Sequence, residues 1–179
     1  METKHELFGL FMPIVNLSAT NPFIDGRQSN RALMIRQGLM RYFDEAGHAV
    51  LPELTLKGGR RADLIALSQN GEITIIEIKS SIEDFRSDKK WFDYLDHCDK
   101  FFFATLADVP TDIFPSDHGL MLADAYGAEV LRPSSSIKLA APRRKTIQVR
   151  FARAAALRLA RCADHAGIDP FELATASDD

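Results

Sequence analysis

The stretch EITIIEIKS, residues 72–80, decides the fold class that the sequence indicates. Its four isoleucines predict a β-strand, because β-branched apolar residues favour strands. Glu77 and Lys79 nevertheless lie two residues apart near its end, and side chains two apart point to the same face of a strand. A strand that is otherwise apolar on both faces is typical of a sheet covered by helices on both sides. The sequence therefore predicts an α/β domain whose central strand carries two charged side chains at one end.

The strand before it, RRADLIALS (residues 60–68), is expected to form a hairpin with it, since Asn70-Gly71 between them is a strong turn signal. Directly opposed residues of an antiparallel pair share a face. A two-residue loop would turn Asp63 away from Glu77, whereas a three-residue loop ending at Gly71 would place the two carboxylates opposite each other. Both loops satisfy the local rules. The site hypothesis below requires the three-residue loop and fails if the two side chains lie on opposite faces.

The rest of the chain predicts one domain of ordinary size with an α-β-β-β-α-β core order. Residues 1–28 are interpreted as an N-terminal extension, 29–166 as the domain and 167–179 as an acidic tail. Pro52 argues for an edge position or a bulge in the first strand. The expected elements are a helix over 30–46, strands over 48–56, 60–68 and 72–80, a helix from about 81 to 96, strands over 100–106, 119–125 and 128–133, and a basic helix over 145–167.

Composition excludes several classes of protein. The 179 residues are 46% hydrophobic and 26% charged, a normal globular balance. No apolar run approaches the ~20 residues of a membrane span, and the short stretch at 7–15 (LFGLFMPIV) is expected to be part of the extension rather than a signal peptide. Cys98 and Cys162 form no CxxC pair and indicate reduced thiols in the cytoplasm. His97 and His118 lack the spacing of zinc ligands.

The charge is unevenly distributed along the chain. The formal net charge is −3, yet residues 130–163 contain nine basic residues and no acidic one. The remainder therefore carries a net charge of −12. This split predicts a basic face for a polyanion on an otherwise acidic protein. The expected nucleic-acid contacts are Arg143, Arg144, Lys145, Arg150 and Arg153, with Lys89 and Lys90 either joining them or forming an ordinary solvated face.

The three charged side chains of the hairpin suggest a chemistry. Two carboxylates a few ångströms apart repel each other unless a cation lies between them. A hard divalent cation such as Mg²⁺ or Mn²⁺ uses a few carboxylate oxygens and keeps several waters. It can polarise a phosphoryl oxygen and activate water, while Lys79 would position that water or stabilise charge. Asp63, Glu77 and Lys79 are thus a sensible phosphodiesterase site.

The spacing of these residues resembles a known motif. AD at 62–63, a 13-residue gap and EIK at 77–79 resemble the bipartite motif of the PD-(D/E)XK nuclease superfamily, with alanine in place of the usual proline. More narrowly, the chain resembles the MmcB family of bacterial DNA-repair proteins over roughly residues 30–165. That resemblance rests on RADLIAL, EIKSS, KKWFDYLDHCDKFFFA and GLMLADAYGAEVLR. It implies a restriction-endonuclease-like fold with a mixed central sheet and helices on both sides.

The resemblance also implies residue roles. Asp63 and Glu77 would be metal ligands, Lys79 the catalytic lysine, and the carbonyl of Ile78 a further ligand. Many members of the superfamily add an acidic residue, for which the candidates are Glu53, which is preferred, and Glu45.

Three functions stay open on the sequence. The first is a metal-dependent nuclease (a hydrolase) acting on DNA in repair. The second is an inactive DNA-binding module on the same fold. The third is an adaptor that binds proteins of a repair complex. DNA is the expected partner in the first two, with no membrane and with a homodimer as an open option.

Overall fold

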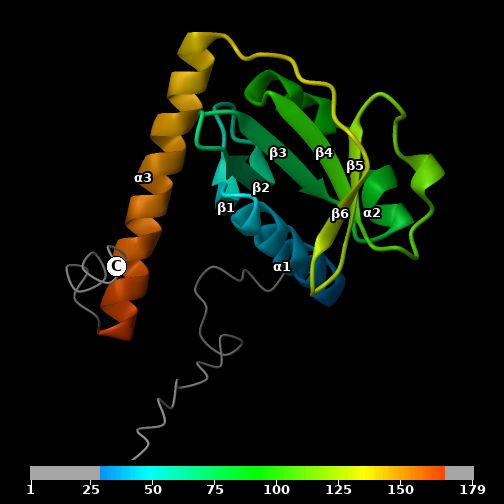
Figure 1. Ribbon diagram of the computed structural model, residues 1–179, viewed down its shortest axis with the longest axis horizontal. Coiled ribbons are helices and arrows are strands. Elements are labelled where there is room, and N and C mark those ends of the chain that lie inside the picture. Colours follow the sequence, from blue (N-terminus) through cyan, green and yellow to red (C-terminus); the bar gives the residue numbers. More distant parts are fainter. Residues whose placement is uncertain (1–28, 168–179) are drawn as a thin grey trace, which may run out of the picture.

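The computed structural model of this chain describes residues 29–167, so the expected extension and nearly all of the acidic tail lie outside the described residues. A six-stranded sheet forms the centre (Figure 1). In chain order the elements are α1 (Asn30–Glu45), β1 (Ala49–Thr55), β2 (Arg61–Leu67), β3 (Ile73–Ile78), α2 (Ile82–Ser87), the 3₁₀ helix η1 (Trp91–His97), β4 (Lys100–Thr105), the 3₁₀ helix η2 (Thr111–Ile113), β5 (Gly119–Ala123), β6 (Ala128–Arg132) and α3 (Ala141–Ala166).

The strands lie side by side in chain order, from β1 to β6. β1, β2 and β3 pair antiparallel, β3, β4 and β5 pair parallel, and β6 returns antiparallel to β5. A parallel pair needs a crossover connection, which α2 and η1 provide between β3 and β4. The expected α/β fold with a mixed central sheet is confirmed, and it is compatible with a restriction-endonuclease-like core.

One face of the sheet is covered by α1. Ile35, Leu39 and Phe43 of the helix pack on a buried layer that includes Ile76 of β3. Ser29 caps the helix by accepting a hydrogen bond from the Ala32 N–H at 3.1 Å. The end of α1 that Ser29 caps therefore has a fixed position at the edge of this layer.

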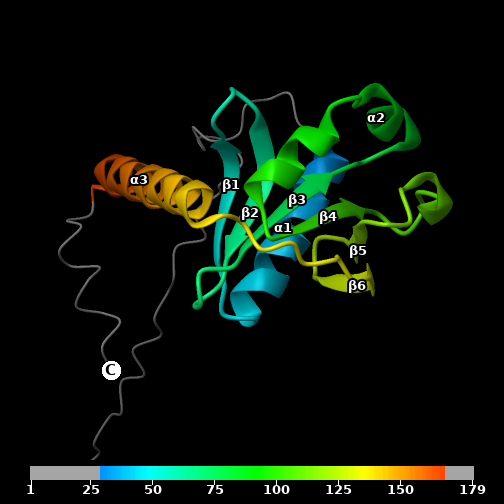
Figure 2. The same ribbon diagram turned by 90° about the horizontal axis from the view of Figure 1, so that it is seen from above.

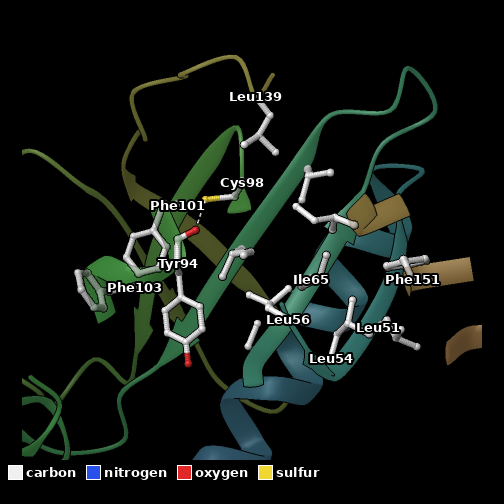
Figure 3. Packing of buried hydrophobic residues seen from close by; sticks show 14 of the residues in the cluster. Leu51, Leu54, Leu56, Ile65, Tyr94, Cys98, Phe101, Phe103, Leu139 and Phe151 are labelled. Carbon is white, nitrogen blue, oxygen red and sulfur yellow. Dashed lines mark hydrogen bonds between the residues drawn. The ribbon is translucent and has the colours of Figure 1, made fainter. Parts of the chain in front are cut away.

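The other face carries a second, larger apolar layer (Figure 3). It joins Ile65 and Ile75 of the sheet to the rings of Tyr94, Phe101 and Phe103. The start of α3 closes this layer with Ile147 and Phe151. Helices on both faces explain why β3 is buried along its whole length.

The helix α3 starts beside the β1 edge of the sheet, and its C-terminal end lies farther from the sheet than its start (Figure 2). Its arginines cover carbonyl groups of that edge strand: Arg150 donates to the Thr55 carbonyl at 3.3 Å, and Arg158 donates to the carbonyls of Pro52 and Glu53. An edge strand exposes unpaired backbone groups, so these arginines block pairing with another chain. The predicted edge position of Pro52 is confirmed.

Two predicted helix bounds were wrong. The helix expected over 81–96 is split into α2 and η1, because the Asp88 carboxylate accepts from the Lys90 N–H at 2.9 Å and interrupts the helix there. The last helix begins at Ala141 instead of residue 145, since Pro142 in its first turn starts a helix without losing a hydrogen bond.

Among residues 29–167 no helix has the length and hydropathy to cross a bilayer. Cys98 is buried, Cys162 is exposed, and both are free thiols.

Candidate active site

The hairpin of β2 and β3 has the three-residue loop. Leu64 pairs with Ile76 and Ile65 with Ile75, a register that places Asp63 opposite Glu77 when continued by one residue. The loop is closed by a hydrogen bond from the Ser68 N–H to the Glu72 carbonyl at 3.0 Å, and Gly71 has a φ of +83°. Only glycine adopts that conformation at little cost. The turn therefore brings the two carboxylates together as predicted.

The regular pairing of β2 with β3 ends just beyond Leu64 and Ile76. From there, carboxylate side chains accept the hydrogen bonds of backbone N–H groups in place of backbone carbonyls. The Asp63 N–H donates to Oε1 of Glu77 at 3.2 Å, and the Ile78 N–H donates to Oδ2 of Asp63 at 2.9 Å. Each carboxylate is thus held in place by the backbone of the opposite strand. The alternation of faces also breaks here, since Ala62 packs in the same apolar layer as Ile65.

The break in alternation has a counterpart in β1. Glu53, which lies beside Asp63 in the β1–β2 register, has a φ of +52°, unusual for a residue with a side chain. As a result Leu51 and Leu54, three residues apart, both point into the same apolar layer. This local twist lies directly beside the carboxylate pair.

The carboxylate pair is poorly solvated. Glu77 is only 3% exposed, and Asp63 is partly buried. Burial raises the pKa of Asp63 to about 6, with the charges of Asp84 and Glu53 adding to the effect. Burial, followed by the charge of Asp63, also raises the pKa of Glu77 well above its ordinary value. Two carboxylates that disfavour ionisation in each other's presence form a site that a cation would stabilise.

Lys79 is a buried cation beside this pair, with 4% of its surface exposed. Its Nζ lies 2.6 Å from Oδ2 of Asp88 and 3.8 Å from Oε2 of Glu77. Burial lowers the pKa of Lys79, but the hydrogen bond that Lys79 donates to Asp88 and the nearby negative charges outweigh this effect, so the net change in the pKa is upward. The lysine is therefore a fixed ammonium group. Its own carbonyl accepts a 2.7 Å hydrogen bond from Thr105 Oγ1.

A cavity of about 340 Å³ opens onto these groups. The first turn of α1 forms part of its wall through Ser29 and Ala32, and Asp84 of α2 adds a third carboxylate. Asp84 accepts from the N–H of Ser80 at 2.9 Å and from its hydroxyl at 3.2 Å. The full lining is Ser29, Ala32, Asp63, Glu77, Ile78, Lys79, Ser80 and Asp84.

Asp84 and Asp88 were absent from the predicted site. Both residues fall within the stretch expected to form one helix from about residue 81 to 96. Their position only seven and eleven residues after Glu77, on the connection leaving the central strand, is the signal that could have found them.

The structure separates the two candidates for an additional acidic ligand. Glu53 is close enough for its charge to affect Asp63, although its carboxylate also lies 3.3 Å from Arg61 and 3.7 Å from Arg36. Glu45 is exposed at the last residue of α1, whereas the first turn of that helix borders the cavity. The 16-residue helix is about 24 Å long at 1.5 Å per residue. Glu45 therefore lies far from the carboxylate pair.

The donor set fits a hard divalent cation. Mg²⁺ is commonly bound through one or two carboxylates while it retains several waters, which matches Asp63 and Glu77, with the Ile78 backbone on the same cavity wall. Within the described part of the chain, no group of three or more acidic, histidine or cysteine side chains is arranged as a complete metal site. A metal held here would thus depend on the two carboxylates and on water.

The cations expected to contact nucleic acid have different surroundings. Arg144 binds both oxygens of the buried Asp99 carboxylate at 2.7 and 2.6 Å and also donates to the Gly71 carbonyl at 2.7 Å. This network connects α3 to the loop that sets the hairpin register, so Arg144 has a structural role. Arg143 forms an exposed ion pair with Asp96 at 2.7 Å.

The other predicted contacts are exposed side chains on two segments. Arg150 of α3 donates to an edge-strand carbonyl, which leaves its charge uncompensated. The remaining members of the exposed set are Lys145 and Arg153 of α3 and Lys89 and Lys90, which lie between α2 and η1.

Comparisons with known proteins find a family and a solved structure that are similar to this chain. The model of the family described as "DNA repair protein MmcB-like" matches residues 19–166. A solved structure of a protein of unknown function from Silicibacter pomeroyi is similar to this chain, with 37% sequence identity and a TM-score of 0.75. The match covers 80% of this chain and 99% of that one. A search of curated proteins finds no match.

Proposed function

The chain belongs to the MmcB-like family of DNA repair proteins, and on that premise we propose that it is a metal-dependent nuclease that hydrolyses DNA phosphodiester bonds. One observation carries the proposal. The hairpin register brings two buried carboxylates with raised pKa values next to a buried ammonium group, at the wall of an open cavity. Such charges are costly to the fold, and perturbed ionisable groups gather at functional sites.

Each residue has a role that its geometry supports. Asp63 and Glu77 would hold Mg²⁺ or Mn²⁺, which when bound polarises a phosphoryl oxygen and lowers the pKa of water. Lys79, fixed as an ammonium by Asp88, is suited to donate hydrogen bonds to a phosphate oxygen or to orient the attacking water, and unsuited to accept its proton. The N-terminal end of α1 faces the same cavity, and its partial positive charge favours a phosphate group there.

The substrate would be held by its backbone. Exposed cations on α3 and around Lys89 and Lys90 supply contacts that are largely independent of sequence and weaken with salt. Arg144 is left out of this set because its guanidinium is engaged by Asp99. Work on DNA in the cytoplasm, with both thiols reduced, belongs to the same proposal. Partner proteins of a repair complex and a homodimer remain predictions.

A DNA-binding module without catalysis is the second candidate. The hydrogen bonds that the site residues already make favour it. One oxygen of each carboxylate already accepts a backbone N–H, and Lys79 is closer to Asp88 than to Glu77. These groups are satisfied without a metal. An adaptor role in a repair complex is a variant of this candidate.

The two candidates are separated by incubating the protein with nicked, branched and single-stranded DNA in Mg²⁺ or Mn²⁺. The nuclease proposal expects cleavage that EDTA stops and that Asp63→Asn removes, while the exposed Asp112→Asn leaves it unchanged. DNA binding without cleavage of any of these substrates would instead establish the binding module.

A further inference from the structure

A second cavity of about 570 Å³ lies outside the candidate active site and shares none of its residues. Three segments form it: the turn between β1 and β2, the end of η1, and the first turns of α3. Lys57, Arg143 and Arg150 line it, one from the turn and two from the helix. Cations contributed by separate elements therefore line one open cavity.

The lining is positively charged overall. Among the described residues that line it, Asp96 is the one carboxylate, set against three cations. It pairs with Arg143 in an ion pair whose two side chains are 57% and 76% exposed, and exposed pairs of this kind contribute little. Arg150 donates to the Thr55 carbonyl, which leaves its charge uncompensated. An anion entering the cavity would meet a net excess of positive charge.

The pKa of His97, which also lines the cavity, is affected by the same positive charges. Burial lowers the pKa of His97, and the charges of Arg143 and Arg150 lower it further, while Asp96 and Asp93 act in the opposite direction. The imidazole is therefore close to both arginines. An anion bound beside them would raise that pKa again, which gives a local signal for occupancy.

The cavity is larger than a phosphate group alone requires, and part of its wall is apolar. Its volume is within the range of roughly 300–1,000 Å³ that pockets for organic ligands show. Pro142 and the buried Ile147 provide apolar surface beside the His97 ring. A ligand that fills this space has an anionic end and a flat, largely apolar body, which is the chemistry of a nucleotide.

The cavity also lies close to the candidate active site. Lys57 is at the turn of the same β1–β2 hairpin that carries Asp63. Tyr94 of η1 donates to the Arg61 carbonyl at 2.9 Å, and its pKa is raised first by burial and then by the charges of Glu77 and Asp63. Thus His97 at the end of η1 borders the cavity. Tyr94 of the same helix is close enough to Asp63 and Glu77 for their charges to affect its pKa.

We propose that this cavity binds one unpaired nucleotide of a DNA strand, with its phosphate on Lys57, Arg143 and Arg150 and its base against Pro142, Ile147 and His97. The inference rests on the proposed DNA binding and specifies its substrate class as DNA with an unpaired end or flap. Free mononucleotides offer the same chemistry and are distinguished below.

The test measures binding by fluorescence anisotropy in EDTA, so that it does not depend on cleavage. A blunt DNA hairpin is compared with the same hairpin carrying a short single-stranded overhang, and with an overhang of abasic sugar-phosphate units. The proposal expects the overhang to bind roughly tenfold more tightly than the blunt end, with most of that gain lost in the abasic form, since base stacking on side chains contributes substantially to single-strand binding. Equal binding of the blunt and overhang forms would overturn it. An abasic overhang that binds as well as the intact one would overturn the base contact.

Two variants locate the effect. Lys57→Gln and Arg150→Gln should each remove most of the preference for the overhang, because losing a charged hydrogen bond to the phosphate would also release the base from its contacts. Arg41→Gln is the control, because it removes an exposed cation of α1 that lies outside the cavity and outside the cations assigned to DNA. An equal loss in all three would mean a general basic surface and would contradict the proposal. Thermal unfolding of each variant checks that the fold is retained.

The occupant is identified by NMR of the His97 imidazole. The overhang DNA should raise its pKa at micromolar concentration, and deoxyadenosine monophosphate should do so only at millimolar concentration. An effect of the mononucleotide at micromolar concentration would assign the cavity to free nucleotides instead of DNA. An unchanged His97 with either ligand would contradict the site. Because no step needs a metal, these results are separate from the success or failure of the nuclease proposal.

Discussion

Replacing Asp63 by asparagine should stabilise the metal-free protein at neutral and alkaline pH. Burial raises the pKa of Asp63 from 3.8 to about 6, so the folded state holds that proton more tightly than the unfolded state. A shift of about two units corresponds to on the order of 3 kcal/mol, at 1.36 kcal/mol per unit. An acid with a raised pKa contributes its full stabilisation below pH 4 and loses it as the pH rises through about 6. Above that pH the ionised carboxylate is a net cost to the fold.

The amide of the Asp63→Asn variant keeps an oxygen for the Ile78 N–H but carries no charge. We therefore expect its free energy of unfolding in EDTA to exceed that of the wild type by roughly 2–3 kcal/mol at pH 8, and the difference to vanish near pH 4. The chain's one tryptophan, Trp91, stacks on Phe101 in the core, so its fluorescence can follow unfolding in urea.

Metal should reverse this order of stability. A ligand that binds only the folded state stabilises it in proportion to the logarithm of its concentration over Kd, so Mn²⁺ should raise the stability of the wild type and leave Asp63→Asn unchanged. The exposed Asp112→Asn is the control. A variant that is no more stable than the wild type at pH 8 in EDTA would refute the reasoning that the pair is held at a cost to the fold.

Three further predictions concern the surroundings that position the site. Arg144→Ala should lower the free energy of unfolding by roughly 3 kcal/mol, because it leaves the buried Asp99 carboxylate without its cation. A loss under about 1 kcal/mol, measured by urea unfolding, would contradict the structural role of Arg144. Gly38→Ala should cost about 3 kcal/mol or more, since its Cβ would lie 2.2 Å from the backbone carbonyl oxygen of Gly127, and an unchanged Tm would disprove that close packing. Gly71→Ala should cost about 1 kcal/mol in the same urea assay, because of its positive φ, and a variant as stable as the wild type would show that the loop tolerates a side chain.

The hairpin was predictable because both of its determinants are local. Apolar residues on both faces of the strands indicated a sheet covered on both sides, and Gly71 in an Asn-Gly turn allowed a three-residue loop, although a two-residue loop remained open. Once the register is known, the meeting of Asp63 and Glu77 follows from geometry alone. This part of the site could be derived from residues within 15 positions of one another.

Other features depend on contacts that no local pattern reveals. The helix after β3 ends early because the Asp88 side chain bonds both to Lys79 and to the Lys90 N–H, and helical spacing alone gave no sign of that. Arg144 looked like one more cation of a basic helix, yet its partner Asp99 lies 45 residues away in sequence. An arginine that forms a long-range ion pair can be distinguished from one that is available to contact DNA only when the fold is known.

A crystal soaked in Mn²⁺ would show whether Asp63 and Glu77 hold a metal ion, because anomalous scattering locates the ion itself. We expect a peak at roughly 2.0–2.3 Å from carboxylate oxygens of both Asp63 and Glu77, with the Lys79 ammonium beside it. The same soak of Asp63→Asn should lack that peak. A wild-type crystal with no anomalous density between the two carboxylates, at a pH well above 6 where Asp63 is ionised, would contradict the metal centre and with it the proposed nuclease.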